Sequence, residues 1–118
     1  MTLGKLQSLL ERERAHALAR FHLDEALGTH HGLSWSDFVL LQRLDSEPAG
    51  VPEAQLARAL GMLRSRLLLR TRPLEKLGLV SRVGSDDARP VKLSPAGRRL
   101  LREARETAAA ACAELTLS

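Results

Sequence analysis

The residues best suited to chemistry in this 118-residue sequence are positively charged, and they are concentrated in one segment. Residues 54–105 contain 13 lysines and arginines against four acidic residues, a net charge of +9. Residues 1–53 carry −3 and residues 106–118 carry −2. Guanidinium and ammonium groups pair with phosphates, so a basic surface confined to one segment predicts binding to a polyanion. The alternative is a solvated surface that reflects an arginine-rich composition.

The four histidines offer a second kind of chemistry, because imidazole is the commonest metal ligand near neutral pH. His16 and His22 are six residues apart in a helical pattern, which places them on different faces. His30 and His31 are expected in a loop that has no cysteine or nearby carboxylate. The spacing therefore argues against a metal site. The sequence has no phosphate-binding loop, HExxH motif or nucleophile motif, so we expect neither an enzyme nor a cofactor.

The basic segment must be positioned by a helix-turn-helix followed by a pair of strands. LARALG places Ala57 four residues before Gly61, as is needed where two helices cross closely and the chain turns sharply. The first helix is predicted over residues 53–60 and the second over residues 63–77. VSRV and PVKL are predicted as short strands over residues 80–83 and 90–93. Ser94 and Pro95 then begin another helix, which should reach about residue 115.

The segments on either side supply further elements. Leucines and other apolar residues recur at threes and fours from residue 3 to about residue 28, which predicts one long helix with surplus apolar surface. Gly28 and Gly32 should break it, and Ser34 should cap the next helix through SWSD. Val51 is expected to supply a short first strand beside the other two. At this length the chain forms one domain, which a dimer would help to stabilise.

Three motifs, LEKLGLVSR, DDAR and LSPAG, occur in this order along the basic segment. Together they resemble the winged helix-turn-helix of the MarR family, bacterial transcription regulators whose pattern reads LE..GLV.R, then D.R, then L(T/S)..G. The resemblance extends more loosely from about residue 3 to residue 115. It implies a mainly α fold with a small β wing (α+β) and a single domain over residues 1–118. Residues 1–32 and 95–118 would be dimerisation helices, and residues 33–94 the DNA-binding lobe.

The resemblance implies a homodimer that binds double-stranded DNA in a sequence-specific way and regulates transcription as a repressor or an activator, and of the two we favour a repressor. Under this interpretation the major groove would be contacted by Arg64, Ser65, Arg66 and Leu69. Phosphates would be held by Arg58, Arg72, Lys76, Arg82 and Lys92. In the wing, Asp87 would orient Arg89, which would reach into the narrow minor groove. An ordinary ion pair within the loop is the alternative for these last two residues.

The predicted recognition helix departs from the family pattern. The family usually has a threonine and an arginine at the positions of Leu68 and Leu69, and an apolar residue at that of Arg70. Pro73 lies inside the helix and predicts a kink near residues 69–72. Helical periodicity places Leu63, Leu67, Thr71 and Leu74 inward. An alternative function is therefore a winged-helix interaction module that has lost or weakened DNA binding and uses residues 67–69 on a protein partner.

Many members of the family bind small, often phenolic, effectors where the dimer helices meet the DNA-binding lobe. Trp35 and Phe38 would lie there, although for Trp35 we favour a role as a packing anchor near the dimer seam over stacking against a ligand. No apolar run is long enough to span a membrane and the N-terminus does not resemble a secretory signal, so we expect a cytoplasmic protein. The single cysteine, Cys112, fits a reducing compartment and is expected to be packed and inert.

Overall fold

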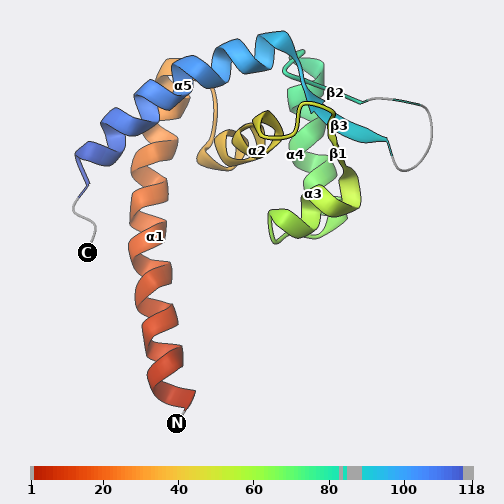
Figure 1. The fold of residues 1–118 in the computed structure, drawn as a ribbon. Coiled ribbons are helices and arrows are strands. Elements are labelled where there is room, and N and C mark those ends of the chain that lie inside the picture. The colour runs from red at the N-terminus through yellow and green to blue at the C-terminus, as the bar shows by residue number, and fades with distance from the viewer. Residues whose placement is uncertain (1, 83, 85–88, 116–118) are drawn as a thin grey trace. The chain divides into compact units, whose positions relative to one another are not determined.

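The computed structural model describes residues 2–82, 84 and 89–115, and it is mainly helical with a three-stranded antiparallel sheet (Figure 1). This is the fold class predicted from the sequence. In chain order the elements are α1 (Thr2–His31), α2 (Trp35–Asp45), β1 (Val51–Pro52), α3 (Glu53–Ala59), α4 (Arg64–Lys76), β2 (Val80–Arg82), β3 (Pro90–Leu93) and α5 (Pro95–Ala113). None of the described helices has the length and apolar character needed to cross a membrane.

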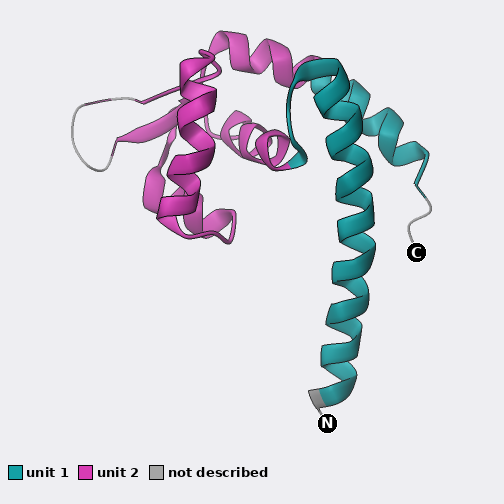
Figure 2. Cartoon of the chain, turned by 180° about the vertical axis from the view of Figure 1, so that it is seen from behind, with its two compact units in different colours: residues 1–35, 104–118 teal, residues 36–103 magenta. Residues whose placement is uncertain are grey.

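The chain divides into two compact units (Figure 2). Unit 1 contains residues 1–35 and 104–118, and unit 2 contains residues 36–103. Unit 2 holds α3, α4 and all three strands, and its core is built from leucines and valines with no more than 3% exposed surface, among them Leu40, Leu41, Leu44, Leu56 and Val91. Unit 1 buries Leu23, Leu27, Ala104, Ala108 and Ala111.

The turn between α3 and α4 forms as the sequence predicts. Gly61 adopts a positive φ of 65°, which is strained for residues with a side chain. The N–H of Met62 donates to the carbonyl of Ala57 over 3.0 Å, and that of Gly61 to the carbonyl of Arg58 over 3.1 Å. These two bonds satisfy carbonyl groups that the end of α3 would otherwise leave without partners.

The buried face of α4 consists of Leu67, Thr71 and Leu74, each no more than 2% exposed. The prediction for these three residues is confirmed, but the inward placement of Leu63 is wrong, because its side chain is 73% exposed. Leu63 precedes the helix with extended backbone angles, φ −69° and ψ 149°, so helical periodicity does not apply to it. α4 continues through Pro73 to Lys76, and the kink near residues 69–72 stays a prediction.

The strands form a sheet in the order β1-β3-β2, with both pairings antiparallel. Val51 pairs with Val91, so the prediction of a short first strand is confirmed. On the other side of β3, Val80 pairs with Leu93 and Arg82 with Val91. The register places Arg82 at the end of β2, next to the start of the wing loop. Most of that loop, including Asp87, lies outside the described residues.

The start of α5 is held against the segment that follows α4. The Ser94 hydroxyl accepts a hydrogen bond from the N–H of Gly97 over 2.9 Å and donates to the carbonyl of Gly78 over 2.5 Å. The predicted cap at Ser94 is therefore confirmed. A Cβ on Gly97 would lie 2.1 Å from the carbonyl oxygen of Leu79, so only glycine fits without a shift of the backbone.

The N-terminal helix is longer than predicted. α1 passes through Gly28 and ends at His31, before Gly32 with its positive φ of 68°. The predicted break at Gly28 is therefore wrong, as is the loop around His30 and His31, because a single glycine costs a packed helix only about 1 kcal/mol. α2 begins at Trp35, directly after the expected cap residue Ser34. Large apolar side chains of α1 are exposed within the chain: Leu3, Leu6, Leu9, Leu10, Leu18 and Phe21.

Candidate nucleic-acid interface

The face of α4 opposite its buried residues is polar and strongly basic. The exposed residues of α4 are Arg64, Ser65, Arg66, Leu69, Arg70, Arg72, Pro73 and Lys76. A helix that exposes five cations and buries only the stripe of Leu67, Thr71 and Leu74 is well suited to lie against a polyanion while docked on its own domain. Arg70, at a position where the family usually has an apolar residue, is among these exposed cations.

Most of the cations predicted to contact DNA are exposed in unit 2. Arg58 lies on α3 and Lys92 on β3, and both are exposed, as are the residues proposed on α4. Residues 36–103 contain 13 basic residues against eight acidic ones, a net charge of +5, whereas unit 1 carries five against six. The positive charge is therefore a property of the unit that contains the helix-turn-helix.

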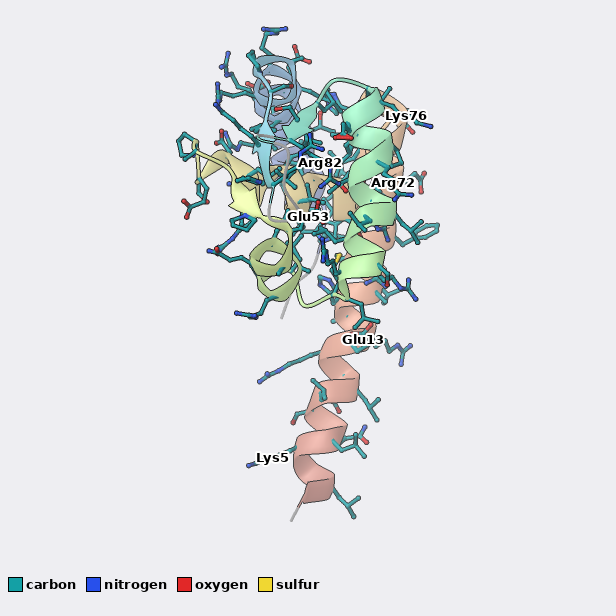
Figure 3. The ribbon with its side chains drawn as sticks, turned by 90° about the vertical axis from the view of Figure 1, so that its right-hand side faces the viewer. Lys5, Glu13, Glu53, Arg72, Lys76 and Arg82 are labelled. Atoms are coloured by element: carbon teal, nitrogen blue, oxygen red, sulfur yellow. The ribbon has the colours of Figure 1, made fainter. Side chains whose placement is uncertain are left out.

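Arg82 is not exposed in this way, because its side chain is only 11% exposed and is held inside the unit. Its Nη1 group donates to Oε1 of Glu53, and its Nε lies 3.2 Å from Oε2 of Glu75. Its Nη2 donates to the hydroxyl of Thr71 over 3.2 Å. Figure 3 shows Arg82 and Glu53 on the strand side of α4, whereas Lys76 projects away from that helix. We therefore replace the predicted phosphate contact of Arg82 with a structural role.

Glu53, besides its contact with Arg82, also contacts an arginine on the exposed surface of α4. The residue is 7% exposed, and its Oε2 atom lies 3.2 Å from Nε of Arg64, whose side chain is 55% exposed. Glu53 begins α3, Arg64 begins α4 and Arg82 ends β2. One carboxylate thus bridges two arginines from different elements of the unit. We name Glu53, Arg64, Thr71, Glu75 and Arg82 the Glu53 network.

Beside the Glu53 network is a hollow of about 280 Å³. Its lining includes four arginines and two glutamates: Arg64, Arg72, Arg82, Arg89, Glu53 and Glu75. Burial, and next the charge of Arg89, lower the pKa of Arg82 from its ordinary value. The half-buried Arg89 therefore faces inward in this structure, and contact with a minor groove requires it to turn outward.

Glu53 is the site residue that the sequence did not reveal. An acidic residue at the start of a helix is ordinarily explained by the helix dipole alone. Its partners are 11 and 29 residues away along the chain, beyond the range of helical or strand periodicity. The arginine of the GLVSR motif was the available signal, since an arginine at the end of a strand so close to the core requires a carboxylate.

The residues predicted for an effector lie in different surroundings. Phe38 is buried, with 8% of its surface exposed. Trp35 is half-buried, and its backbone N–H donates to Oδ1 of Asp24 over 2.6 Å. A hollow of about 400 Å³ in unit 1 has neither residue in its lining, which comes from α1 and α5: His22, His30, His31, Thr107, Ala111 and Glu114 among others.

Two histidines of this hollow have polar neighbours. His31 Nε2 lies 2.6 Å from the hydroxyl of Thr107, and His22 Nε2 lies 2.9 Å from Oε2 of Glu114 but is not aligned for a hydrogen bond. Among the described residues no group of three or more His, Cys, Asp or Glu side chains could hold a metal ion. Cys112 is exposed within the chain, so the packed thiol predicted from the sequence is wrong.

Comparisons with known proteins place this geometry in a family. No protein-family model and no curated protein matches the chain. Among solved structures, the MarR family protein Rv2887 of Mycobacterium tuberculosis is 32% identical, with a TM-score of 0.75 over 96% of this chain and 82% of that one. The chain belongs to the MarR family.

Two further MarR structures are similar to this one. Sco3205, a MarR family transcriptional regulator from Streptomyces coelicolor solved in complex with DNA, is 25% identical, with a TM-score of 0.81 over 98% of this chain and 78% of that one. Rv2887 in complex with p-aminosalicylic acid is 33% identical, with a TM-score of 0.72 over 94% of this chain and 86% of that one.

Proposed function

We propose that this MarR protein is a homodimeric, sequence-specific DNA-binding repressor. The observation that carries the proposal is the exposed basic face of α4, opposite the buried Leu67, Thr71 and Leu74. A helix anchored in this way can enter a major groove, with its first turns toward the bases. The similar protein Sco3205 has been solved in complex with DNA, which supports the same kind of ligand here.

The contacts divide by their position on the unit. Arg64, Ser65, Arg66 and Leu69 belong to the first turns of α4 and contact base edges. Phosphates are held by the exposed cations around them, Arg58, Arg72, Lys76 and Lys92. In the wing Arg89 turns outward into the minor groove, where narrow A·T-rich sequence concentrates negative potential, and Asp87 orients it.

Dimerisation is supported by the exposed apolar side chains of α1. Leu3, Leu6, Leu9, Leu10 and Phe21 are each at least 51% exposed in the chain. Apolar side chains in such number along one helix are rarely left in water, and a second copy of α1 is the simplest cover. A dimer also allows two copies of α4 to enter successive major grooves of the same face of DNA. We place this function in the cytoplasm.

The experiment that tests the function is selection of bound duplexes from a randomised DNA library. A regulator of this type enriches sequences with two related half-sites, and Arg66→Ala reduces that enrichment. A reporter gene placed behind the selected sequence then establishes repression, because expression falls when the protein is present. Recovery of no preferred sequence, together with no binding to any duplex, would favour the protein-interaction module instead.

We further propose control by a small aromatic acid, because Rv2887 has been solved with salicylic acid and with p-aminosalicylic acid. Of the two residues predicted to contact an effector, Trp35 is half-buried, while Phe38 becomes accessible only if its packing opens. Trp35 is the only tryptophan, so its fluorescence reports binding directly. Salicylate should quench it and release the selected duplex. Release without quenching would place the effector away from Trp35.

A further inference from the structure

Glu53 is an acidic residue in a place where acids are rare. It is 7% exposed, and burial of a carboxylate costs several kcal/mol unless charged or hydrogen-bonding partners compensate. Its two oxygens go to different arginines, Oε1 to Arg82 and Oε2 to Arg64. The side chain of the first arginine is only 11% exposed, and the second reaches the basic surface of α4. Glu53 therefore joins the interior of the unit to the surface that we propose meets DNA.

The inner side of this connection is rigid. Arg82 is held at three points, by Glu53, by Glu75 at 3.2 Å from its Nε and by the Thr71 hydroxyl at 3.2 Å from its Nη2. Thr71 is 1% exposed and belongs to the buried face of α4. The Glu53 carboxylate is consequently fixed relative to both β2 and α4.

On the outer side of this connection, Glu53 contacts Arg64, whose guanidinium can reach the edge of a DNA base. Nε of Arg64 is 3.2 Å from Oε2 of Glu53, while 55% of the side chain remains exposed. A guanidinium has five N–H donors, of which the contact with Glu53 uses the one on Nε, and two parallel N–H groups are enough to recognise guanine. An unrestrained arginine loses more side-chain entropy when it contacts a base.

We propose that Glu53 is a positioning residue that orients Arg64 for contact with one base pair in the major groove. The inference rests on the proposed function and deepens it, since it names the source of specificity at that base pair. Net stabilisation by the network is a poor explanation for its presence. Burial lowers the pKa of Arg82, and buried ion pairs are often no more stabilising than apolar residues of the same size.

A DNA-free measurement tests the orientation itself. With ¹⁵N-labelled protein, the Nε–H signal of Arg64, assigned by its loss in Arg64→Lys, should be observed and protected from exchange with water. In Glu53→Gln, which removes the charge at nearly constant size, that protection should be lost. In Glu75→Gln it should persist, because the contact that Glu75 makes is with Arg82. Unprotected Arg64 in the parent protein would overturn the inference whatever happens with DNA.

A DNA-binding measurement tests the consequence. Arg64→Ala should abolish the preference at one base pair of each half-site selected from the randomised library. Glu53→Gln should weaken the sequence preference at the same base pair and at no other. It should weaken binding to the selected duplex roughly 5- to 30-fold, while binding to unrelated duplex is unchanged or tighter. Glu53→Gln should have no further effect on preference in the Arg64→Ala background, and Glu75→Gln should keep the parent's preference.

The outcomes separate this inference from the proposed function. Parent protein that selects a sequence but keeps every preference in Glu53→Gln contradicts the positioning role alone. An equal loss of preference at this base pair in Glu53→Gln and Glu75→Gln would mean that both changes disturb the unit in general. That result would also overturn the positioning role of Glu53. If thermal melting shows that Glu53→Gln is unfolded, Glu53→Asp keeps the charge beside Arg82 but is too short to reach Arg64 as well. Glu53→Asp should also weaken the sequence preference at the base pair that Arg64 contacts, and an unchanged preference would refute the proposal.

Discussion

Leu67 and Leu69 lie two residues apart on α4 and face opposite ways: Leu67 has no exposed surface, whereas Leu69 is 70% exposed. Leu69→Ala should leave the free energy of unfolding nearly unchanged, while Leu67→Ala should lower it by about 2–5 kcal/mol. If Leu69 contacts a thymine methyl group, Leu69→Ala should weaken binding to the selected duplex by about 1 kcal/mol.

A change in the DNA provides the matched test of that contact. Replacing the contacted thymine with uracil removes the methyl group and should weaken binding by the parent as much as Leu69→Ala does. The protein change and the DNA change together should cost no more than either alone. Additive losses would show that Leu69 and the methyl group act independently.

Gly97→Ala should destabilise the protein, because the new Cβ would lie 2.1 Å from the carbonyl oxygen of Leu79. A shift of α5 or of the segment before β2 is needed, which we expect to cost about 1–3 kcal/mol in the free energy of unfolding. Gly4→Ala is the control, since nothing lies within 4 Å of its Cβ position and alanine favours a helix. Denaturant unfolding of both variants checks the prediction, and equal stability would mean that residue 97 is not closely packed.

The dimer can be tested on α1. Leu6→Glu and Leu10→Glu together place two charges among exposed apolar side chains and should produce a monomer, since an interface that buried them would leave both carboxylates unpaired. Sedimentation should give twice the chain mass for the parent and the chain mass for the variant. Leu77→Glu, at a leucine with 68% exposure in unit 2, should remain a dimer. A parent that sediments as a monomer at tens of micromolar would rule this interface out.

Arg89 should be needed for DNA binding but not for folding. Arg89→Ala removes the proposed minor-groove contact and should weaken binding to the selected duplex by about 1–3 kcal/mol. The loss should be greater with A·T-rich flanks, whose narrow groove favours a guanidinium. The melting temperature should not fall, because Arg82 and Arg89 line the same hollow and the loss of one cation relieves like-charge repulsion. Equal binding by variant and parent across a series of flanking sequences would reject the contact.

Local rules predicted much of this structure. The buried face of α4, the turn at Gly61 and the cap at Ser94 each depend on residues within a few positions of one another or on a simple period. The short strand at Val51, which pairs with the distant Val91, was instead predictable from the resemblance to winged-helix folds. Predictions failed where a residue's surroundings come from distant segments. The sequence predicts a phosphate contact for Arg82 because its partner Glu53 lies 29 residues away and no local rule reveals it. It predicts a break at Gly28 from the low helix propensity of glycine, but the packing of α1 outweighs that propensity and the helix continues.

A salt titration of duplex binding tests the central claim most directly, since phosphate contacts release counterions in proportion to their number. With four phosphate-binding cations proposed per chain, about eight contacts per dimer, raising the salt from roughly 50 to 200 mM should weaken binding to the selected duplex on the order of ten-thousandfold. Lys76→Ala should reduce the salt slope and weaken selected and random duplexes alike, whereas Arg66→Ala should mainly reduce the ratio between them. Binding that is absent, or independent of salt, would contradict the assignment of the α4 face to DNA and would favour a protein partner for it.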